Sequence, residues 1–265
     1  MEKWIEKELT ILVKTYPNLS KKYEELVCVA GIDNQGNWNR IYPVPYRDLK
    51  DNQKFKLFQQ IKVRALKSSD SRPESFKVEP ESISLGHILK SKGPDLNRRR
   101  LVVDQAFMGS MCDLLEEQKQ NRSSLGAIRV KKLIEFKVEQ PSKEERWDKE
   151  VILRVSQNSL FNQDREQLEE PKFSFKYKYR CENTNCNTHT QSITAWEIQQ
   201  AFRNWRSKYS EEIALQMIEQ KWGEQMWEAN KDTVLFVGNH KKNPQGFLVL
   251  GVFWPTVGFT QQQLL

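Results

Sequence analysis

Short runs of hydrophobic and β-branched residues recur along the first third of the chain, separated by turn residues. The runs that we expect to form strands are residues 9–16, 26–32, 38–44 and 61–66. The cluster 33–37 is rich in Asp, Asn and Gly, which favour the turn of a hairpin. Short strands joined by regular turns predict a small β-barrel.

The middle of the chain predicts a loop, a helix and further strands. Residues 90–100 form a basic segment that we interpret as a loop, and Asp104 is in place to cap a helix. The expected apolar face of this helix consists of Phe107, Met111, Leu114 and Leu115. Residues 125–130 and 133–138 again have the composition of strands.

The last third predicts a smaller α+β unit. Residues 172–180, 232–238 and 247–253 have strand patterns, and 239–244 form a turn. Thr194 and Glu197 have capping-box spacing for one helix, and Ser210 is in place to cap a second.

A charged, turn-prone stretch, 140–149, and a second loop, 162–171, favour a domain boundary near residue 140. The predicted fold class is therefore α+β, with an OB-like β-barrel region in 1–140 and a smaller α+β domain in 141–265. Two related barrels, from 9–67 and 83–138, are an alternative for the first part.

The segment 172–180 alternates strictly, with an aromatic residue at every second position and basic residues or Ser174 at the positions between. As a strand it places Phe173, Phe175, Tyr177 and Tyr179 on one face and the basic residues on the other. We expect the aromatic face to be core and the basic face to be solvated, where it can attract phosphates.

Charge strengthens this interpretation. The chain has 42 Lys and Arg against 35 Asp and Glu, a surplus of +7, which favours an acidic partner such as nucleic acid. Arg40 has an alternative role, because it or Arg47 can pair internally with Asp70 or Glu74. The predicted nucleic-acid-binding residues are Arg40, Arg64, Lys90, Lys92, Arg98, Arg99, Arg100, Lys172, Lys176, Lys178 and Arg180.

Cysteine and histidine residues predict a metal site in the second domain. Cys181, Cys186 and His189 lie within nine residues on a polar knuckle, and thiolate and imidazole are the ligands that tetrahedral zinc prefers. We expect His240 to be the fourth ligand of a closed structural zinc site, with Glu197 and Cys112 as weaker candidates. Water in the fourth position would make the site catalytic, and the alternative without metal is a pair of reduced thiols.

The four cysteines do not form a disulfide framework, no stretch has the length and hydrophobicity of a membrane span, and the N-terminal segment lacks a signal-peptide core. We therefore expect a cytoplasmic protein. Phosphate-loop, dinucleotide-binding and nucleophile-elbow motifs are absent. The group Asp70, Glu74 and Lys77 has the residue types of a metal-dependent nuclease, but no partner set of carboxylates accompanies it.

The run from Glu25 to Val44, ELVCVAGID followed by GNWNRIYPV, resembles the opening hairpin of dual OB-fold proteins of bacterial mobile-element and anti-phage conflict systems. SLGAIRV, Ser124 to Val130, is similar to the Leu-Gly strand of their second barrel. The resemblance implies nucleic-acid binding and a defence or mobile-element setting, and it transfers no catalytic residue.

Taken together, the sequence predicts a nucleic-acid-binding accessory protein, of DNA or of RNA. The alternatives are a metal-dependent nuclease or other hydrolase that uses the Cys/His site, and an adaptor subunit that contacts other proteins in a larger complex.

Overall fold

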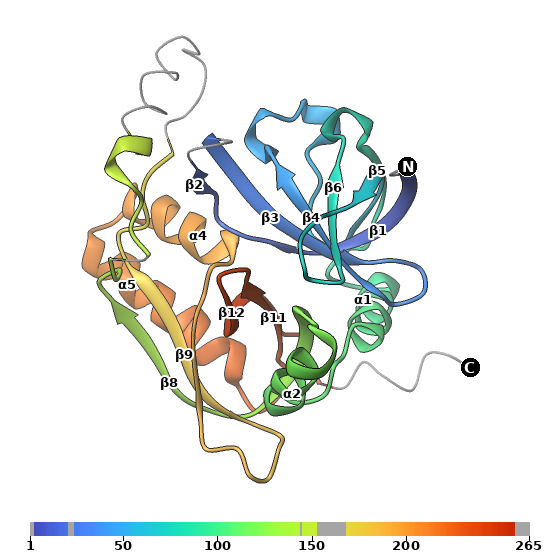
Figure 1. The fold of residues 1–265 in the computed structure, drawn as a ribbon. Coiled ribbons are helices and arrows are strands. Elements are labelled where there is room, and N and C mark those ends of the chain that lie inside the picture. The colour runs from blue at the N-terminus through green and yellow to red at the C-terminus, as the bar shows by residue number, and fades with distance from the viewer. Residues whose placement is uncertain (1–2, 21–23, 144, 153–167, 258–265) are drawn as a thin grey trace.

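Two β-sheets organise the protein (Figure 1). The computed structural model describes residues 3–20, 24–143, 145–152 and 168–257. The predicted α+β class is confirmed, with a closed barrel, a more open second barrel and a few helices. The predicted loop 162–171 lies largely outside the described residues.

The first sheet contains a closed five-stranded ring. The whole sheet has seven strands: β1 (Ile5–Lys14), β2 (Asn18–Ser20), β3 (Glu24–Ile32), β4 (Trp38–Val44), β5 (Gln59–Lys67), β6 (Ser75–Val78) and β7 (Ser84–Ile88). The ring consists of β1, β3, β4, β5 and β6. Within the ring, β1 pairs with β3 and β5, β3 pairs with β4, and β5 pairs with β6, all antiparallel. The parallel pair β4–β6 closes it. This is the connectivity of an OB-fold, as the sequence predicts.

The second sheet repeats this connectivity with weaker closure. Its strands are β8 (Leu125–Glu139), β9 (Ser174–Cys181), β10 (His189–Ser192), β11 (Val234–His240) and β12 (Asn243–Phe253). β8 pairs with β9 and β11, β9 pairs with β10, and β11 pairs with β12, all antiparallel. A parallel bridge between Ile193, just after β10, and Val249 of β12 stands where the first barrel has its parallel pair. The protein therefore has two barrels of the same topology, and the second spans 125–253 and not 83–138.

Helices occupy equivalent connections in the two barrels. Two short 3-10 turns, Tyr46–Asp48 and Asp51–Gln53, follow the third strand of the first barrel. In the second barrel this place is taken by α4 (Trp196–Arg206) and α5 (Glu211–Ile218). A π-helix, Glu219–Glu224, and a 3-10 turn, Gln225–Trp227, continue from α5. A further 3-10 turn, Pro80–Ser82, precedes β7.

The caps of these later helices agree only in part with the sequence. Ser210 caps α5 as predicted, because its hydroxyl accepts from the Ile213 N–H. The capping box at Thr194 is wrong: the Thr194 hydroxyl donates to the Val249 carbonyl and so helps to close the second barrel.

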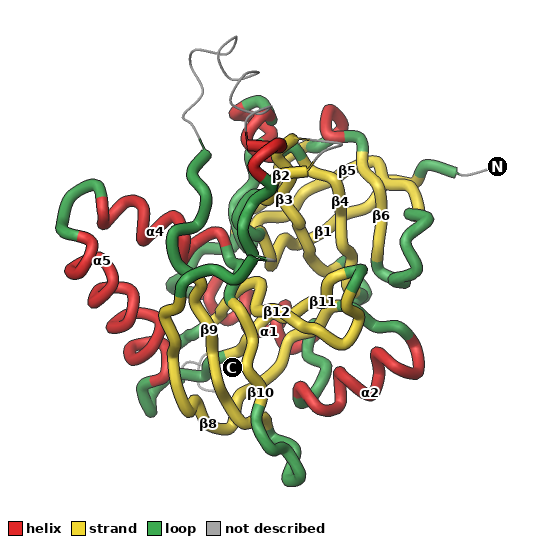
Figure 2. Tube along the Cα trace, turned by 60° about the vertical axis from the view of Figure 1, so that its left-hand side comes forward, coloured by secondary structure: helices red, strands yellow, loops and turns green. Residues whose placement is uncertain are grey.

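The helices between the barrels also differ from the prediction. α1 (Pro94–Gln105) occupies most of the segment predicted to be a basic loop. Its start was indicated by Pro94, because proline suits the first turn of a helix. α2 (Met111–Asn121) is capped by Ser110 and not by Asp104, which lies within α1. Figure 2 shows α2 on one side of β8, β9 and β10, with α4 and α5 on the other side.

The two barrels share a hydrophobic core. Trp38 donates through Nε1 to the Ala106 carbonyl at 2.9 Å, and its ring meets that of Phe236 edge-on, with centroids 6.2 Å apart. Around this contact, Ala30 and Ile32 of β3 pack with Leu125 and Ala127 of β8 and with residues of β11 and β12. The outer face of β3 and β4 is therefore covered by the second barrel.

This packing moves the predicted domain boundary. β8 pairs with β11 along its first part and with β9 along the remainder, so it is the central strand of the second sheet. A division at residue 140 would separate β8 from its own sheet. The change from one sheet to the other takes place between Ile88 and Leu125, in the segment that holds α1 and α2.

Candidate metal centre and nucleic-acid interface

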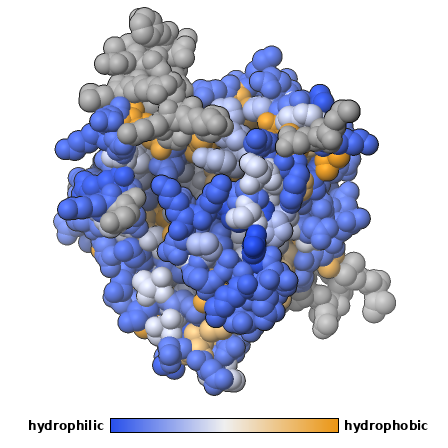
Figure 3. Space-filling model, viewed as in Figure 1, coloured by the Kyte–Doolittle hydropathy of each residue, from blue (hydrophilic) through white to orange (hydrophobic). Residues whose placement is uncertain are grey.

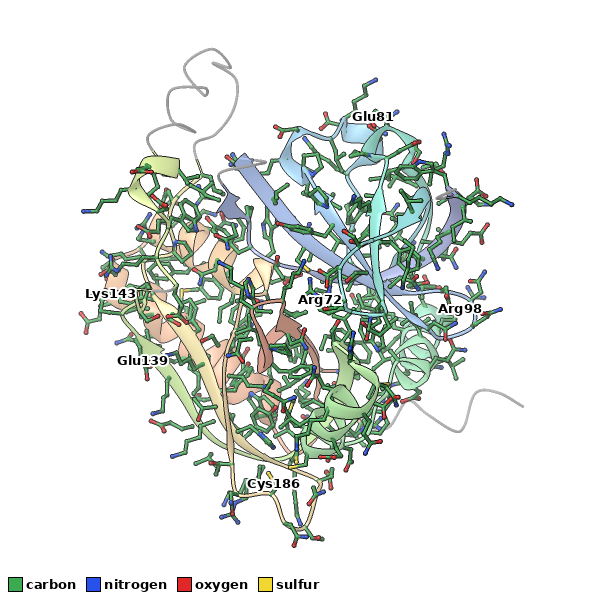
Figure 4. All side chains as sticks on the ribbon, in the orientation of Figure 1. Arg72, Glu81, Arg98, Glu139, Lys143 and Cys186 are labelled. Carbon is green, nitrogen blue, oxygen red and sulfur yellow. The ribbon has the colours of Figure 1, made fainter. Side chains whose placement is uncertain are left out.

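Three cysteines and one histidine meet at one end of the second barrel. Their ligand atoms all lie within 4.8 Å of one another, and the group consists of Cys112, Cys181, Cys186 and His189. Figure 4 shows Cys186 at this end, where the β9–β10 turn passes close to α2 and sulfur atoms gather. Among the residues that the structure describes, no other group of His, Cys, Asp and Glu side chains is arranged to hold a metal ion.

The distances within the cluster suit a tetrahedral ion. The Sγ atoms of Cys112 and Cys181 are 3.5 Å apart, and Cys112 Sγ lies 3.4 Å from His189 Nε2. Ligands of a tetrahedral zinc ion are separated by about 3.6–3.8 Å, given Zn–S and Zn–N bonds of about 2.3 and 2.0–2.1 Å. The cluster can therefore bind a metal.

Local structure explains how the knuckle brings its ligands together. Cys181 ends β9 and His189 begins β10, where it is the neighbour of Tyr179 across the strand pair. Between them, the Asn183 side chain accepts from the Asn185 N–H, and the Asn183 carbonyl accepts from the Cys186 N–H. The Cys181 N–H also points at Cys186 Sγ, 3.4 Å away, so the turn folds its polar groups around the sulfur atoms.

The electrostatics favour thiolate at one ligand. Burial raises the pKa of Cys181, but N–H groups of Cys112 and Asn183, helped by Cys186 and His189, lower it to about 6. Burial and the adjacent Cys181 raise the pKa of Cys112 to about 12. A bound cation would reverse the second effect, because it stabilises each thiolate that contacts it.

The fourth predicted ligand, His240, does not belong to the cluster. It is the last residue of β11, where burial and the positive charges of Arg72, Lys242 and Arg40 lower its pKa. Cys112, the weaker candidate in the sequence, takes its place. The sequence offered no spacing signal for Cys112, because α2 is far from the knuckle along the chain and only tertiary packing brings it there.

The cluster attaches α2 to the second barrel. Met111 and Leu114 of α2 are fully buried in the core of this barrel, and Met111 Sδ lies 3.3 Å from Gln191 Nε2 of β10. At its other end, the Gln118 side chain of α2 accepts from Gln245 at the start of β12. α2 therefore bridges the two strands between which the barrel is most weakly closed, and Cys112 fixes its N-terminal end.

The basic residues of the segment 90–100 do not share one exposed surface. Lys90, Lys92 and Arg98 are exposed, and Arg98 pairs with Asp95 at 3.4 Å. Arg99 donates to the Leu89 carbonyl and lies over the Phe58 ring. Arg100 is buried and bonds to Asp232 at 3.2 Å and to the Thr256 carbonyl at 2.7 Å, so it is a structural residue and not a contact for nucleic acid.

The remaining predicted basic residues lie on different parts of the molecule. Arg64 is exposed on β5 and pairs with Glu79 at 3.0 Å, while Lys172 pairs with Glu211. Lys176 of β9 forms an ion pair with Glu139 of β8. Figure 4 shows Glu139 and Arg98, which is on α1, on opposite sides of the protein. The predicted residues therefore do not form one continuous surface.

Arg40 is buried in the junction of the two barrels. Its guanidinium donates to the Ser124 carbonyl at 3.0 Å, to the Ser124 hydroxyl at 3.2 Å and to Cys28 Sγ at 3.2 Å. Only 3% of the residue is exposed, so the predicted contact with nucleic acid is wrong. The outward face of β4, where the alternation of the sequence places Arg40, is an interface within the chain.

We expect Arg40→Ala to lower the free energy of unfolding by about 2–3 kcal/mol, because it removes the hydrogen bonds that a buried guanidinium donates to Ser124 and Cys28 at the junction of the barrels. The affinity of the folded protein for nucleic acid should not change. Chemical denaturation measures the first quantity and a binding titration the second. A loss of affinity without a loss of stability would show that Arg40 is a surface contact after all.

The outer face of β8 and β9 carries basic residues of the segment 172–180. Phe175, Tyr177 and Tyr179 point inward and are fully buried, as the alternation predicts. On the outer side, register pairs bring Lys132 beside Arg180 and Lys137 beside Lys176, with Lys178 between them on β9. Glu135 and Glu139 lie on the same side.

The carboxylates of the nuclease-like group have structural partners. Asp70 forms an ion pair with Arg72 at 2.6 Å, and Glu74 accepts from the N–H and the hydroxyl of Ser124. Arg72 also donates to the Asn239 carbonyl, and Figure 4 places it at the centre of the molecule, where the barrels meet. These groups tie the barrels together. Arg47 pairs with Glu25 at 2.9 Å and not with Asp70 or Glu74.

The visible surface is mainly polar. In Figure 3, hydrophobic residues are scattered among hydrophilic ones on the face shown. Within the described part of the chain, no helix combines the length and the hydrophobicity needed to cross a membrane.

Comparisons with known proteins agree with a two-part chain. Residues 5–105 match the model described as Domain of unknown function (DUF8758), and residues 107–265 match the one described as Domain of unknown function (DUF8757). A search of curated proteins found no match. A solved structure of a murine DNA-binding protein bound to double-stranded DNA is 9% identical, with 97% of this chain and 98% of that chain covered and a TM-score of 0.30. A TM-score this low does not establish a common fold.

Proposed function

Because the chain belongs to the family described as Domain of unknown function (DUF8757), a description that assigns no activity, we propose a function from the structure. The protein binds nucleic acid through the outer face of its second barrel and holds a zinc ion that stabilises this barrel.

The observation that carries the proposal is that the same face is covered in the first barrel and not in the second. OB-folds bind oligonucleotides on the face of their second and third strands. In the first barrel these strands are β3 and β4, and the second barrel covers them. In the second barrel they are β9 and β10, whose outer side carries Lys178 and Arg180. The surface available to a polyanion is therefore on the second barrel.

Zinc is the metal that the ligand set favours. Thiolate and imidazole ligands in a tetrahedral arrangement select zinc among the common divalent ions. Four protein ligands close the coordination shell, whereas catalytic zinc keeps a position for water. We therefore assign the ion a structural role, which leaves the hydrolase alternative without a metal site among the described residues.

The cellular setting stays a prediction of the sequence. Cytoplasmic location and participation in a defence or mobile-element system follow from composition and from the resemblance to dual OB-fold proteins. The genes next to this one test the second point, because an operon of defence or transposition genes would define the class of partner.

A titration of nucleic acid binding against salt tests the proposed function. We expect binding of DNA or RNA at about 50 mM salt, with log affinity falling linearly with log salt concentration, since each phosphate contact releases counterions. Fluorescence anisotropy of a labelled oligonucleotide measures it. If neither DNA nor RNA bound at low salt, the proposed function would be wrong, and the adaptor alternative would be favoured.

A further inference from the structure

Some basic residues on the outer side of the second barrel form ion pairs with carboxylates, and others do not. Lys176 pairs with Glu139 at 2.7 Å, and Lys137 pairs with Glu135 at 3.5 Å. Glu135 is also the register partner of Lys178 on the neighbouring strand, but its printed ion pair is with Lys137. Among the described residues, no acidic group lies within ion-pair distance of Lys132, Lys178 or Arg180. Together with a neighbouring hydroxyl they form what we call the basic patch: Lys132, Lys178, Arg180 and Thr190.

The four residues of the basic patch lie on one face of three adjacent strands. Lys132 of β8 is the register partner of Arg180, and Thr190 of β10 is the register partner of Lys178. Lys178 and Arg180 are separated along β9 by roughly 6.7 Å, twice the rise per residue of a strand. This spacing is close to that of successive phosphates along one nucleic-acid strand.

The knuckle orients one of these charges. The Nε atom of Arg180 donates to the Asn187 carbonyl at 3.1 Å, and Asn187 lies between Cys186 and His189 of the metal cluster. The terminal nitrogens of the guanidinium are then free to donate to phosphate oxygens in the geometry that suits an arginine fork. The charge is held in place before any ligand arrives, which lowers the entropic cost of binding.

The basic patch has no aromatic platform. The aromatic residues of β9 are turned into the barrel core, where they are fully buried. Among the described residues, Tyr42 and Tyr209 are the strongly exposed aromatics, and neither lies on β8, β9 or β10. Sequence-tolerant binding of single strands depends on stacking of bases on such side chains.

We propose that the basic patch binds the sugar–phosphate backbone of double-stranded nucleic acid, without contacts to the bases; the inference rests on the proposed function and specifies its ligand. A duplex presents its phosphates in a fixed array, whereas a flexible single strand must be ordered on a surface that offers no stacking in return. Binding therefore depends on charge and is insensitive to sequence.

The test compares a duplex with each of its separated strands, using the full chain in a salt titration followed by anisotropy. Three phosphate contacts predict a slope of log affinity against log salt of about −2.7 for the duplex, a loss of about 40-fold between 50 and 200 mM. We expect the duplex to bind more tightly than either strand and two duplexes of unrelated sequence to bind equally. Lys178→Ala and Arg180→Ala should each weaken binding and reduce the slope by about 1.

Lys50→Ala is the matched control. It removes the same charge from an exposed position between the two 3-10 turns of the first barrel, and we expect wild-type affinity. Thermal unfolding of all variants checks that they are folded, and Lys178→Gln, which keeps the length of the side chain, replaces Lys178→Ala if that variant does not fold.

The outcomes separate the two proposals. Tighter binding of the single strand, or a duplex affinity equal in wild type and in both patch variants, overturns this inference and leaves nucleic-acid binding in place. Absence of binding to duplex and strands at low salt overturns the proposed function itself.

Discussion

With zinc in the proposed site, Cys112→Ser is expected to release the ion from the protein and to lower its thermal stability. Zinc that binds only the folded state stabilises it by about 4 kcal/mol when free zinc is about 1,000 times the dissociation constant. The variant loses a ligand from α2, and α2 fills the weakly closed side of the second barrel with Met111 and Leu114. Metal content by mass spectrometry and melting temperature measure the two effects.

The chain supplies two matched controls for this experiment. Cys28→Ser changes a cysteine that lies outside the cluster, in the first barrel, and His240→Ala removes the ligand that the sequence alone predicts. Both variants should retain the zinc content of the wild type. Treatment of the wild type with a strong chelator should reproduce the lower melting temperature of Cys112→Ser. Wild-type zinc content in Cys112→Ser would exclude the cluster as the metal site.

Trp38→Ala is expected to destabilise the whole protein by about 3–5 kcal/mol, as is usual when a large aromatic side chain is removed from a core. Trp38 is 8% exposed and lies between the barrels, where it contacts Phe236 and donates to the Ala106 carbonyl. Because the barrels share this core, we expect one cooperative transition, at a lower denaturant concentration. Chemical denaturation followed by tryptophan fluorescence and by circular dichroism measures the change.

Trp4→Ala is the control for this substitution. Trp4 is half-buried, just before β1, and its ring lies 5.9 Å from the Arg64 guanidinium. We expect a loss of less than about 1 kcal/mol in the free energy of unfolding, since Trp4 is not part of the shared core. Equal effects of the two substitutions would show that the outer face of β3 and β4 does not carry the contact between the barrels.

The substitutions at Cys112 and Trp38 test two parts of the same arrangement of barrels. The first barrel buries the outer side of β3 and β4 against the second barrel, whereas Arg180 and Thr190, on the outer side of β9 and β10, are exposed next to the candidate metal cluster. A buried, apolar outer face suits Ala30, Ile32 and Trp38, whereas an open face suits Lys178 and Arg180. The same topology therefore serves as a structural support in one copy and as a candidate binding surface in the other.

Patterns of short range predicted much of the local structure. The strict alternation in 172–180 placed Phe175, Tyr177 and Tyr179 inside and the basic residues outside, because successive side chains of a strand point to opposite faces. The turn at 33–37 and the cap at Ser210 likewise depend on neighbouring residues. Cys181, Cys186 and His189 were found for the same reason, because one turn holds all three.

What the sequence by itself determined was the α+β class, the OB-like first barrel, the inward and outward faces of β9 and three of the four ligands of the cluster. Tertiary structure decided the partners of β8, the burial of Arg40 and Arg100, and the choice of Cys112 over His240. The reason is physical: a side chain's periodicity is set by the backbone next to it, whereas strand pairing and ligand convergence depend on contacts between distant segments. The local sequence does not determine that the outer face of β3 and β4 is covered by the other barrel while that of β9 and β10 is not.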